Sequence, residues 1–205
     1  MKLIEQSWEW VQIPELPLQI IEKAGRTCYK SENKITDASA EKFVEMICRQ
    51  GHESVLEHVS ASVRLITNRG VTHELVRHRL CAFSQESTRY VRYSGDMEFI
   101  IPVWWDESTD AQRALWKQAM ADAEKAYGKL LEEGWRPEQA REVLPNSLKT
   151  EIVVTANIRE WRHIFNIRTS KATHPQMRAL MLSCLAGFQE EFPVLFDPDS
   201  PVQPG

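Results

Sequence analysis

A polar stretch between residues 77 and 90 has the residue types needed to hold a phosphate-bearing ligand. It opens with Arg77-His78-Arg79. Ser87 follows after a gap of seven residues, and Arg89 comes two residues after Ser87. Arginine presents a planar fork of N–H donors that binds a phosphate or a carboxylate at two points. The serine hydroxyl and the neighbouring Gln85 and Glu86 add hydrogen bonds that a sugar or a base can use. The stretch therefore predicts a site for a nucleotide-like anion.

The charge distribution supports this interpretation. For a single arginine pair, the ordinary explanation is a solvated helix end, where the macrodipole favours positive charge. The whole chain, however, carries a net charge of −4, whereas residues 64–93 and residues 159–178 each carry a local charge of +4. Two basic islands in an acidic protein indicate a local anionic ligand more than a surface that coats nucleic acid.

Four ordered segments of the chain resemble those of flavin-dependent thymidylate synthases. GHESVLEH (residues 51–58) resembles the GHE[ST]xxEH segment of that family, and the stretch RHR-x7-S, continued by Arg89 and Tyr90, resembles its signature. AREVLP (residues 140–145) and the set Asn157, Arg159, His163 and Arg168 resemble two later segments. The matching segments span roughly residues 26–190, and their order argues against coincidence.

The resemblance implies an enzyme, a methyltransferase that converts dUMP to dTMP. The one-carbon unit would come from 5,10-methylenetetrahydrofolate, and NADPH would supply the reducing equivalents through FAD, without a covalent enzyme nucleophile. The family's fold is an α+β domain that assembles as a homotetramer, with each active site built from several subunits. The dUMP phosphate, the FAD pyrophosphate and the folate glutamate are all anions, which agrees with the two basic islands.

The resemblance also implies roles for individual residues. The FAD-binding set is Ser54, Arg77, His78, Arg79, Gln85, Asn157, Arg159 and His163. The dUMP-binding set is Glu74, Arg77, Gln85, Glu86, Ser87, Arg89, Arg141 and Arg168. Many family members carry Glu where this chain has Gln85, so the sequence leaves open whether Gln85 or Glu86 faces the nucleotide. Two extra residues between Arg168 and His174 leave the role of His174 open as well.

We predict that Arg168 is the catalytic residue and that Ser87 binds dUMP without attacking it. A serine hydroxyl is a poor nucleophile unless a base takes its proton, and the neighbours of Ser87 are mostly arginines, which cannot act as bases at neutral pH. A fixed positive charge on Arg168 beside the uracil edge would stabilise the ring with N3 deprotonated, or negative charge on its carbonyl oxygens, and either makes C5 nucleophilic.

We expect no metal. His73 and Glu74 begin a pattern like the HExxH motif of zinc proteases, but the second histidine, His78, comes one residue late. On a helix the two histidines would lie about 140° apart and could not share one ion. The spacing of His52 and His58 matches no common metal site, so a packed or tautomer-locked role is expected for them.

A non-catalytic nucleotide- or RNA-binding protein is the alternative interpretation of the basic islands. Such a protein would need no redox cofactor, and its binding would depend strongly on salt. The enzyme interpretation predicts no nucleic-acid partner and a flavin in the purified protein.

The elements that must position these residues follow from hydrophobic periodicity. Helices are predicted at residues 40–50, 71–78, 110–133, 137–144, 159–167 and 176–192, and strands at 59–65, 98–103 and 148–156. An irregular polar stretch is expected up to residue 93. In the longest helix Ser108 or Thr109 should cap the start and Gly134 should follow the end. Its buried stripe should be Leu115, Trp116, Ala119, Met120, Ala123, Tyr127, Leu130 and Leu131.

Composition and element order predict a single α+β domain over residues 1–205. The domain should contain a small mixed or antiparallel sheet and several long helices, because the elements lack a βαβ rhythm. Residues from about 194 to 205 should form a loose, proline-rich tail. No apolar run approaches the roughly 20 residues of a membrane span, and the N-terminus reads as neither signal nor transit peptide. The four cysteines form no CxxC pair, which indicates reduced thiols in a cytoplasmic protein.

Overall fold

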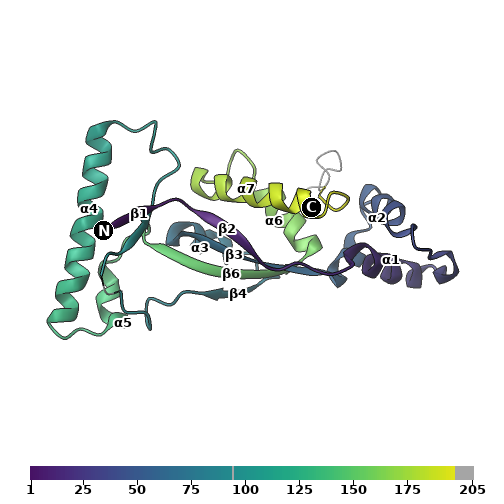
Figure 1. Ribbon diagram of the computed structural model, residues 1–205, viewed down its shortest axis with the longest axis horizontal. Helices are drawn as coiled ribbons and strands as arrows, with labels where there is room; N and C mark the ends of the chain where they lie inside the picture. The colour runs from purple at the N-terminus through teal and green to yellow at the C-terminus, as the bar shows by residue number, and fades with distance from the viewer. Residues whose placement is uncertain (94, 197–205) are drawn as a thin grey trace. The chain divides into compact units, whose positions relative to one another are not determined.

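The computed structural model describes residues 1–93 and 95–196 and combines helices with two small sheets in this part of the chain (Figure 1). The strands are β1 (Lys2–Ile4), β2 (Ser7–Gln12), β3 (Ser60–Asn68), β4 (Ala82–Gln85), β5 (Glu98–Ile100) and β6 (Lys149–Asn157). The α-helices are α1 (Pro17–Cys28), α2 (Ala40–Arg49), α3 (Arg69–Leu75), α4 (Asp110–Glu132), α5 (Pro137–Ala140), α6 (Ile158–Arg168) and α7 (Pro175–Glu191). Three 3-10 helices are η1 (Glu32–Lys34), η2 (Glu53–His58) and η3 (Arg141–Val143). The predicted mixture of helices and strands is confirmed.

The chain divides into two compact units, and neither is one continuous stretch. Unit 1 contains Met1–Glu9, Arg64–Arg77 and Phe83–Val153, and unit 2 contains Trp10–Val63, His78–Ala82 and the chain from Val154 onward. The prediction of a single domain over the whole chain stays a prediction. Among the described residues, no helix is long and apolar enough to cross a membrane.

Strands β3 and β6 are neighbours in the four-stranded sheet, whose order is β2-β3-β6-β4. In unit 2 the backbone N–H of Ile158 donates to Val59, and in unit 1 that of Arg69 donates to Asn146, so the two strands run antiparallel. In β6 every second residue is buried, as is typical of a strand with one face in the core. The remaining sheet pairs β1 with β5 in parallel.

Both long strands pass directly into a helix through an asparagine. Asn68 ends β3, and its Oδ1 accepts the backbone N–H of Val71 at 2.9 Å. Asn157 ends β6, and its Oδ1 accepts the backbone N–H of Glu160 at 2.8 Å. Each asparagine satisfies a donor that the first turn of the helix would otherwise leave unpaired. Each strand is therefore joined to its helix without an intervening loop, β3 to α3 and β6 to α6.

Each unit has its own apolar core. In unit 1, Met97, Phe99, Met120, Tyr127 and Leu148 pack together, with Phe99 on β5 and Met120 and Tyr127 on α4. In unit 2 the core is aromatic and built from Trp10, Trp161, Phe165, Phe188, Phe192 and Phe196, whose rings meet mostly at tilted and edge-on angles, with Trp161 and Phe165 stacked. Aromatic rings favour such geometry over face-to-face stacking.

The structure corrects several predicted elements. Helix α3 ends at Leu75, so Arg77 and His78 follow the helix instead of forming its last turn. Strand β4 lies in the stretch that was expected to be irregular, and the predicted strand at 98–103 ends at Ile100. The predicted helix at 137–144 is α5 followed by the 3-10 helix η3. Strands β1 and β2 and helix α1 were not anticipated.

Helix α4 begins and ends as predicted, but its stripe is only partly buried. Thr109 and Gln112 form a capping box, and Gly134 adopts a positive φ of 91° just beyond the helix. Leu115 is 73% exposed, so it does not belong to the core. The residues of the stripe that are fully buried are Met120 and Tyr127; the expectation was wrong for Leu115 and for the exposed Ala119.

The C-terminal tail begins later than predicted. Leu195 and Phe196 are buried, and the backbone carbonyl of Leu195 accepts a hydrogen bond from Arg162. A loose tail from residue 194 is therefore wrong for residues 194–196. Residues 197–205, where the rest of that prediction falls, lie outside the described part of the chain.

Candidate active site

Four side chains of unit 2, which we call the His78 cluster, bring together two distant segments of the sequence motifs. The cluster consists of His78, Glu160, His163 and Arg168. His78 follows α3, whereas the other three residues lie on α6. Arg168 Nε donates to His78 Nε2 at 2.9 Å, which joins the RHR signature to a residue 90 positions away.

The hydrogen bond from Arg168 determines the tautomer of His78. Because Nε2 accepts, a neutral ring must carry its proton on Nδ1. His78 Nδ1 faces Glu160 Oε1 across 3.5 Å, and both side chains are more than nine-tenths buried. The imidazole of His78 therefore lies between the guanidinium of Arg168, which donates to it, and the carboxylate of Glu160, which faces its Nδ1–H.

Burial keeps the imidazole of His78 neutral. Desolvation, followed by the charges of Arg168 and His163, lowers the pKa of His78 from 6.5 to about 4. Desolvation also raises the pKa of Glu160 above its ordinary value, and the charges of His163 and Arg159 oppose that rise. At neutral pH, His78 is an acceptor for Arg168 and not a second cation beside it.

The His78 cluster also has the ligand types of a metal site. One ligand atom each from His78, Glu160 and His163 lies within 4.8 Å of the others, while His163 itself is exposed. The guanidinium of Arg168 adds a fixed positive charge next to His78, which opposes binding of a cation. The expected absence of a metal stays a prediction. His52 and His58 are exposed, so a packed role is wrong for them, and the tautomer-locked role stays a prediction.

The other predicted FAD-binding residues of unit 2 lie around α6 and η2. Asn157 caps α6 through Oδ1, and Arg159 pairs with Glu57 of η2. The ion pair between the fully buried Arg162 and Glu53, at 3.0 Å, holds η2 against α6. Ser54 is exposed on η2. Arg79 is exposed, and its guanidinium makes no hydrogen bond or ion pair with any described residue.

In unit 1, Gln85 belongs to a hydrogen-bonded group that we call the Gln85 network. Gln85 Nε2 donates to Thr72 Oγ1 at 2.9 Å and to Thr150 Oγ1 at 3.2 Å. Arg69 Nη1 donates to the same Thr150 hydroxyl at 3.4 Å. Thr72 and Thr150 are fully buried, so these bonds satisfy hydroxyls that water cannot reach.

Glu86 has a different set of partners from Gln85. Tyr93 donates its hydroxyl to Glu86 Oε1 at 2.8 Å, and Lys149 Nζ lies 3.5 Å from Glu86 Oε2. Burial and the bond to Glu86 raise the pKa of Tyr93, so the phenol remains a donor. Both carboxylate oxygens of Glu86 thus have protein partners, whereas the hydrogen bonds of Gln85 use its amide nitrogen.

The remaining predicted dUMP-binding residues are dispersed over unit 1. Ser87 Oγ accepts the backbone N–H of Arg89 at 3.2 Å, and no hydrogen bond from Ser87 to a basic group occurs within residues 1–93 and 95–196. Arg89 Nε lies 3.1 Å from Glu138, and Arg141 Nη1 donates to Thr88 at 3.4 Å. Glu74 is half-buried, and Arg77 is exposed, with no hydrogen bond or ion pair from its guanidinium to a described residue.

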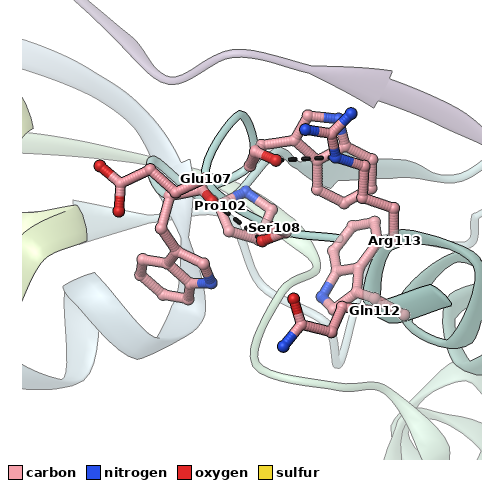
Figure 2. A pocket seen from close by; sticks show the side chains of 8 residues that line it. Pro102, Glu107, Ser108, Gln112 and Arg113 are labelled. Carbon is pink, nitrogen blue, oxygen red and sulfur yellow. Dashed lines mark hydrogen bonds between the residues drawn. The ribbon is translucent and has the colours of Figure 1, made fainter. Parts of the chain in front are cut away.

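A pocket elsewhere in unit 1 contains none of the predicted site residues. It has a volume of about 400 Å³ and is lined by Trp104, Trp105 and Trp116 together with polar residues of α4 and of the loop before it. Figure 2 shows Arg113 beside this pocket, where its Nε donates to the carbonyl of Trp105 at 2.8 Å. Arg113 also donates to the carbonyl of Asp106, so it fastens the loop to α4. We assign the pocket a structural role.

Sequence reasoning missed Glu160 and the two threonines of the Gln85 network. Glu160 had a detectable signal, because it is the only acidic residue among five cations in the second basic island. An isolated carboxylate in such a setting is a candidate partner for one of the cations. Thr72 and Thr150 gave no signal, because their role depends on the sheet that brings them to Gln85.

Comparison with known proteins identifies the family. The model of the family described as thymidylate synthase complementing protein matches residues 11–194. A flavin-dependent thymidylate synthase of Corynebacterium efficiens is 37% identical, and the match covers 86% of this chain and 77% of that protein. The chain belongs to the flavin-dependent thymidylate synthase family. The resemblance seen in the four sequence segments is thus confirmed.

Two further relatives define how far the similarity extends. A flavin-dependent thymidylate synthase of Geobacter sulfurreducens is 34% identical over 88% of this chain and 81% of its own. Among solved structures, a UMP/dUMP methylase of Streptomyces cacaoi, bound with 5-Br dUMP, superposes with a TM-score of 0.82. It covers 96% of both chains at 24% identity, which shows a shared fold.

Proposed function

We propose that this protein is an FAD-dependent thymidylate synthase that methylates dUMP to dTMP with 5,10-methylenetetrahydrofolate as carbon donor and NADPH as reductant. The observation that carries the proposal is the hydrogen bond between His78 and Arg168. It links two segments that the family resemblance assigns to flavin and to nucleotide. The cytoplasmic location of the reaction stays a prediction.

The donor set of the chain fits FAD. Arg77 and Arg79 both present guanidinium groups that have no described protein partner, and such groups suit a pyrophosphate. Ser54, Asn157, Arg159, His163 and Gln85 complete the proposed set. When bound, FAD would supply the transfer of reducing equivalents from NADPH. The protein's part is to bind and orient the cofactor.

For dUMP, we propose that Arg168 stabilises negative charge on the uracil ring. Its bond to the neutral His78 leaves the positive charge of the guanidinium uncompensated by that neighbour. Such a preorganised charge favours the N3-deprotonated ring and so a nucleophilic C5. Ser87 binds the nucleotide without attacking it, which is supported by its lack of a basic partner among the described residues.

We further propose a homotetramer in which several subunits contribute to each site. Two large apolar residues of the signature segment, Leu80 and Tyr90, are 77% and 76% exposed, which suits a surface covered by another subunit. Mixing the inactive variants Arg77→Ala and Arg168→Ala should then restore activity through hybrid sites. Full activity of an isolated monomer would contradict the shared site.

The function itself is tested by colour and by product. The purified protein, or the protein after incubation with FAD, should absorb near roughly 450 nm, as flavoproteins do. With dUMP, methylenetetrahydrofolate and NADPH it should release dTMP, detected by chromatography. A colourless protein that takes up no FAD and binds RNA with strong salt dependence would instead support the non-catalytic alternative.

A further inference from the structure

We propose that Glu160 is a positioning residue for Arg168 and acts through His78. Its carboxylate faces His78 Nδ1–H and thereby keeps Nε2 available to accept from Arg168 Nε, which directs the guanidinium. The inference rests on the proposed function, in which Arg168 acts on dUMP. It assigns a role to a residue outside the predicted FAD- and dUMP-binding sets.

The two ends of this link lie on the same helix but cannot form an ordinary helical ion pair. Glu160 and Arg168 are eight residues apart, which corresponds to about 12 Å along α6. Pairs on a helix surface meet at three or four residues. The imidazole of His78, which comes from another segment, fills the distance between them.

Glu160 is well fixed at the start of α6. Asn157 Oδ1 accepts the backbone N–H of Glu160 at 2.8 Å, so the carboxylate starts from a capped and ordered turn. The side chains of Glu160 and His78 are 8% and 5% exposed, which excludes most competing water. The buried hydrogen bond from Arg168 and the 3.5 Å contact with Glu160 hold the imidazole in one arrangement.

The charges around His78 are consistent with a neutral link. Arg168 and His163 face the ring as cations or potential cations, and Glu160 faces it as the anion. A proton on Nε2 would remove the acceptor that Arg168 uses and place two cations side by side. Glu160 opposes this by favouring the Nδ1–H tautomer.

A purely structural role for Glu160 must be separated from positioning. An acidic residue in the first turn of a helix is favourable in itself. Loss of stability alone therefore decides nothing. The deciding measurements are a coupling between Glu160 and Arg168 in turnover and the tautomer of His78.

The experiment compares Glu160→Gln, Arg168→Lys and the double variant in the FAD-loaded enzyme. Glu160→Gln should lower kcat for dTMP by roughly tenfold, because a misdirected catalytic group loses rate steeply. Flavin content, oxidation of NADPH and the KM for dUMP should change by less than about twofold, since uniform binding is retained. In the Arg168→Lys background, which lacks the Nε–H, Glu160→Gln should cause no further loss.

The tautomer gives a readout that does not depend on activity. Nitrogen NMR of the wild type should show His78 with an unprotonated Nε2. In Glu160→Gln the side-chain amide can donate to Nδ1, so a population protonated at Nε2 should appear. If Glu160→Gln does not fold, Glu160→Asp, which keeps the charge but shortens the side chain, replaces it and should show an intermediate loss of kcat.

The matched control is Glu22→Gln. Glu22 is also a nearly fully buried carboxylate of unit 2, and it pairs with Arg26 and Ser39 of the same unit. It should lose stability without a change in kcat or in the His78 tautomer. Additive losses in the double variant, an unchanged tautomer, or a stoichiometric metal that Glu160→Gln releases would overturn the inference. A wild type that binds FAD but makes no dTMP would refute the proposed function instead, while the tautomer would still decide the link.

Discussion

The two units hold their predicted ligand-binding residues in contrasting ways. In unit 2, His78 and Arg168 contact each other directly, and Glu160 extends the contact. In unit 1, Gln85 and Glu86 instead contact residues with no predicted role, among them Thr72, Thr150, Tyr93 and Lys149. In unit 2, predicted site residues contact one another, whereas in unit 1 each of these two residues is held by residues outside the predicted sets.

This difference has an energetic consequence. Residues that contact one another have coupled mutational effects, whereas residues that share no partner have nearly additive ones. Substitutions in the His78 cluster should therefore depend strongly on one another. Substitutions among Gln85, Glu86 and Ser87 should report on each residue by itself.

The largest expected effect contrasts Arg168 of unit 2 with Ser87 of unit 1. Arg168→Ala should lower the rate of dTMP synthesis by about 10²–10³, because it removes a preorganised charge. It should keep FAD and still oxidise NADPH. Ser87→Ala should retain measurable synthesis at saturating dUMP, because the hydroxyl only binds. A covalent adduct at Ser87 found by mass spectrometry, or near-normal dTMP output from Arg168→Ala, would reverse the contrast.

The second prediction concerns pH and the stability of unit 2. The pKa of His78 is about 4 in the native protein and about 6.5 when unfolded. Between these values the unfolded chain binds a proton that the native chain does not, so the free energy of unfolding should fall as the pH falls from 6.5 to 4. The fall in the pKa from 6.5 to about 4 corresponds to about 3 kcal/mol.

Urea unfolding of the wild type and of His78→Gln between pH 7 and pH 4 measures this effect. The other titratable groups of the chain are the same in both proteins, so the difference between the two curves isolates His78. Parallel curves would mean that His78 is protonated in the native state. That result would also contradict its role as acceptor for Arg168.

The third prediction separates Gln85 from Glu86. Gln85→Ala should raise the KM for dUMP and cost about 1–2 kcal/mol, because it leaves the buried hydroxyls of Thr72 and Thr150 with fewer partners. Glu86→Gln should reduce stability through Tyr93 and Lys149 with little change in that KM. Steady-state kinetics and thermal unfolding of both variants decide the matter. The opposite pattern of KM values would assign the nucleotide to Glu86.

The smallest expected effect compares the two asparagine caps. Asn68→Ala and Asn157→Ala should each cost about 1 kcal/mol, which corresponds to a fall in Tm of roughly 2–4 °C for a chain of this size. Only Asn157→Ala should also weaken FAD binding, because Asn157 belongs to the proposed FAD set. Asn→Ser at either position should restore most of the Tm. Equal FAD affinity in both alanine variants would remove Asn157 from that set.

The sequence predicted local structure better than it predicted contacts. The strand predicted at residues 59–65, the cap at Thr109 and the stop at Gly134 follow from residues close together in the chain, and all three are confirmed. The exposure of Leu115 could not be predicted, because helical periodicity marks an apolar stripe without showing whether a neighbouring element covers it. Strand β4 escaped notice because it is only four residues long and ends in two polar residues, Ser84 and Gln85.

For the candidate site, the motifs marked residues but not their partners. His78 was assigned to flavin and Arg168 to nucleotide, and their direct contact was not foreseen. Such a contact depends on how α6 lies against the segment after α3, which no local pattern specifies. The same holds for the buried pair of Arg162 and Glu53, which are 109 positions apart.

The loop-free joint at Asn157 makes this part of the chain intolerant of changes in length. One residue inserted between β6 and α6 would turn the helix by about 100° relative to the strand. Arg159, His163 and Arg168 would then rotate together away from His78 and η2, although every one of them would still be present. A deletion would have the same effect in the opposite sense. Variation in chain length among working versions of this protein should therefore collect in the turns around α4 and before α7, while the nine residues of β6 and the helix after them keep a fixed length.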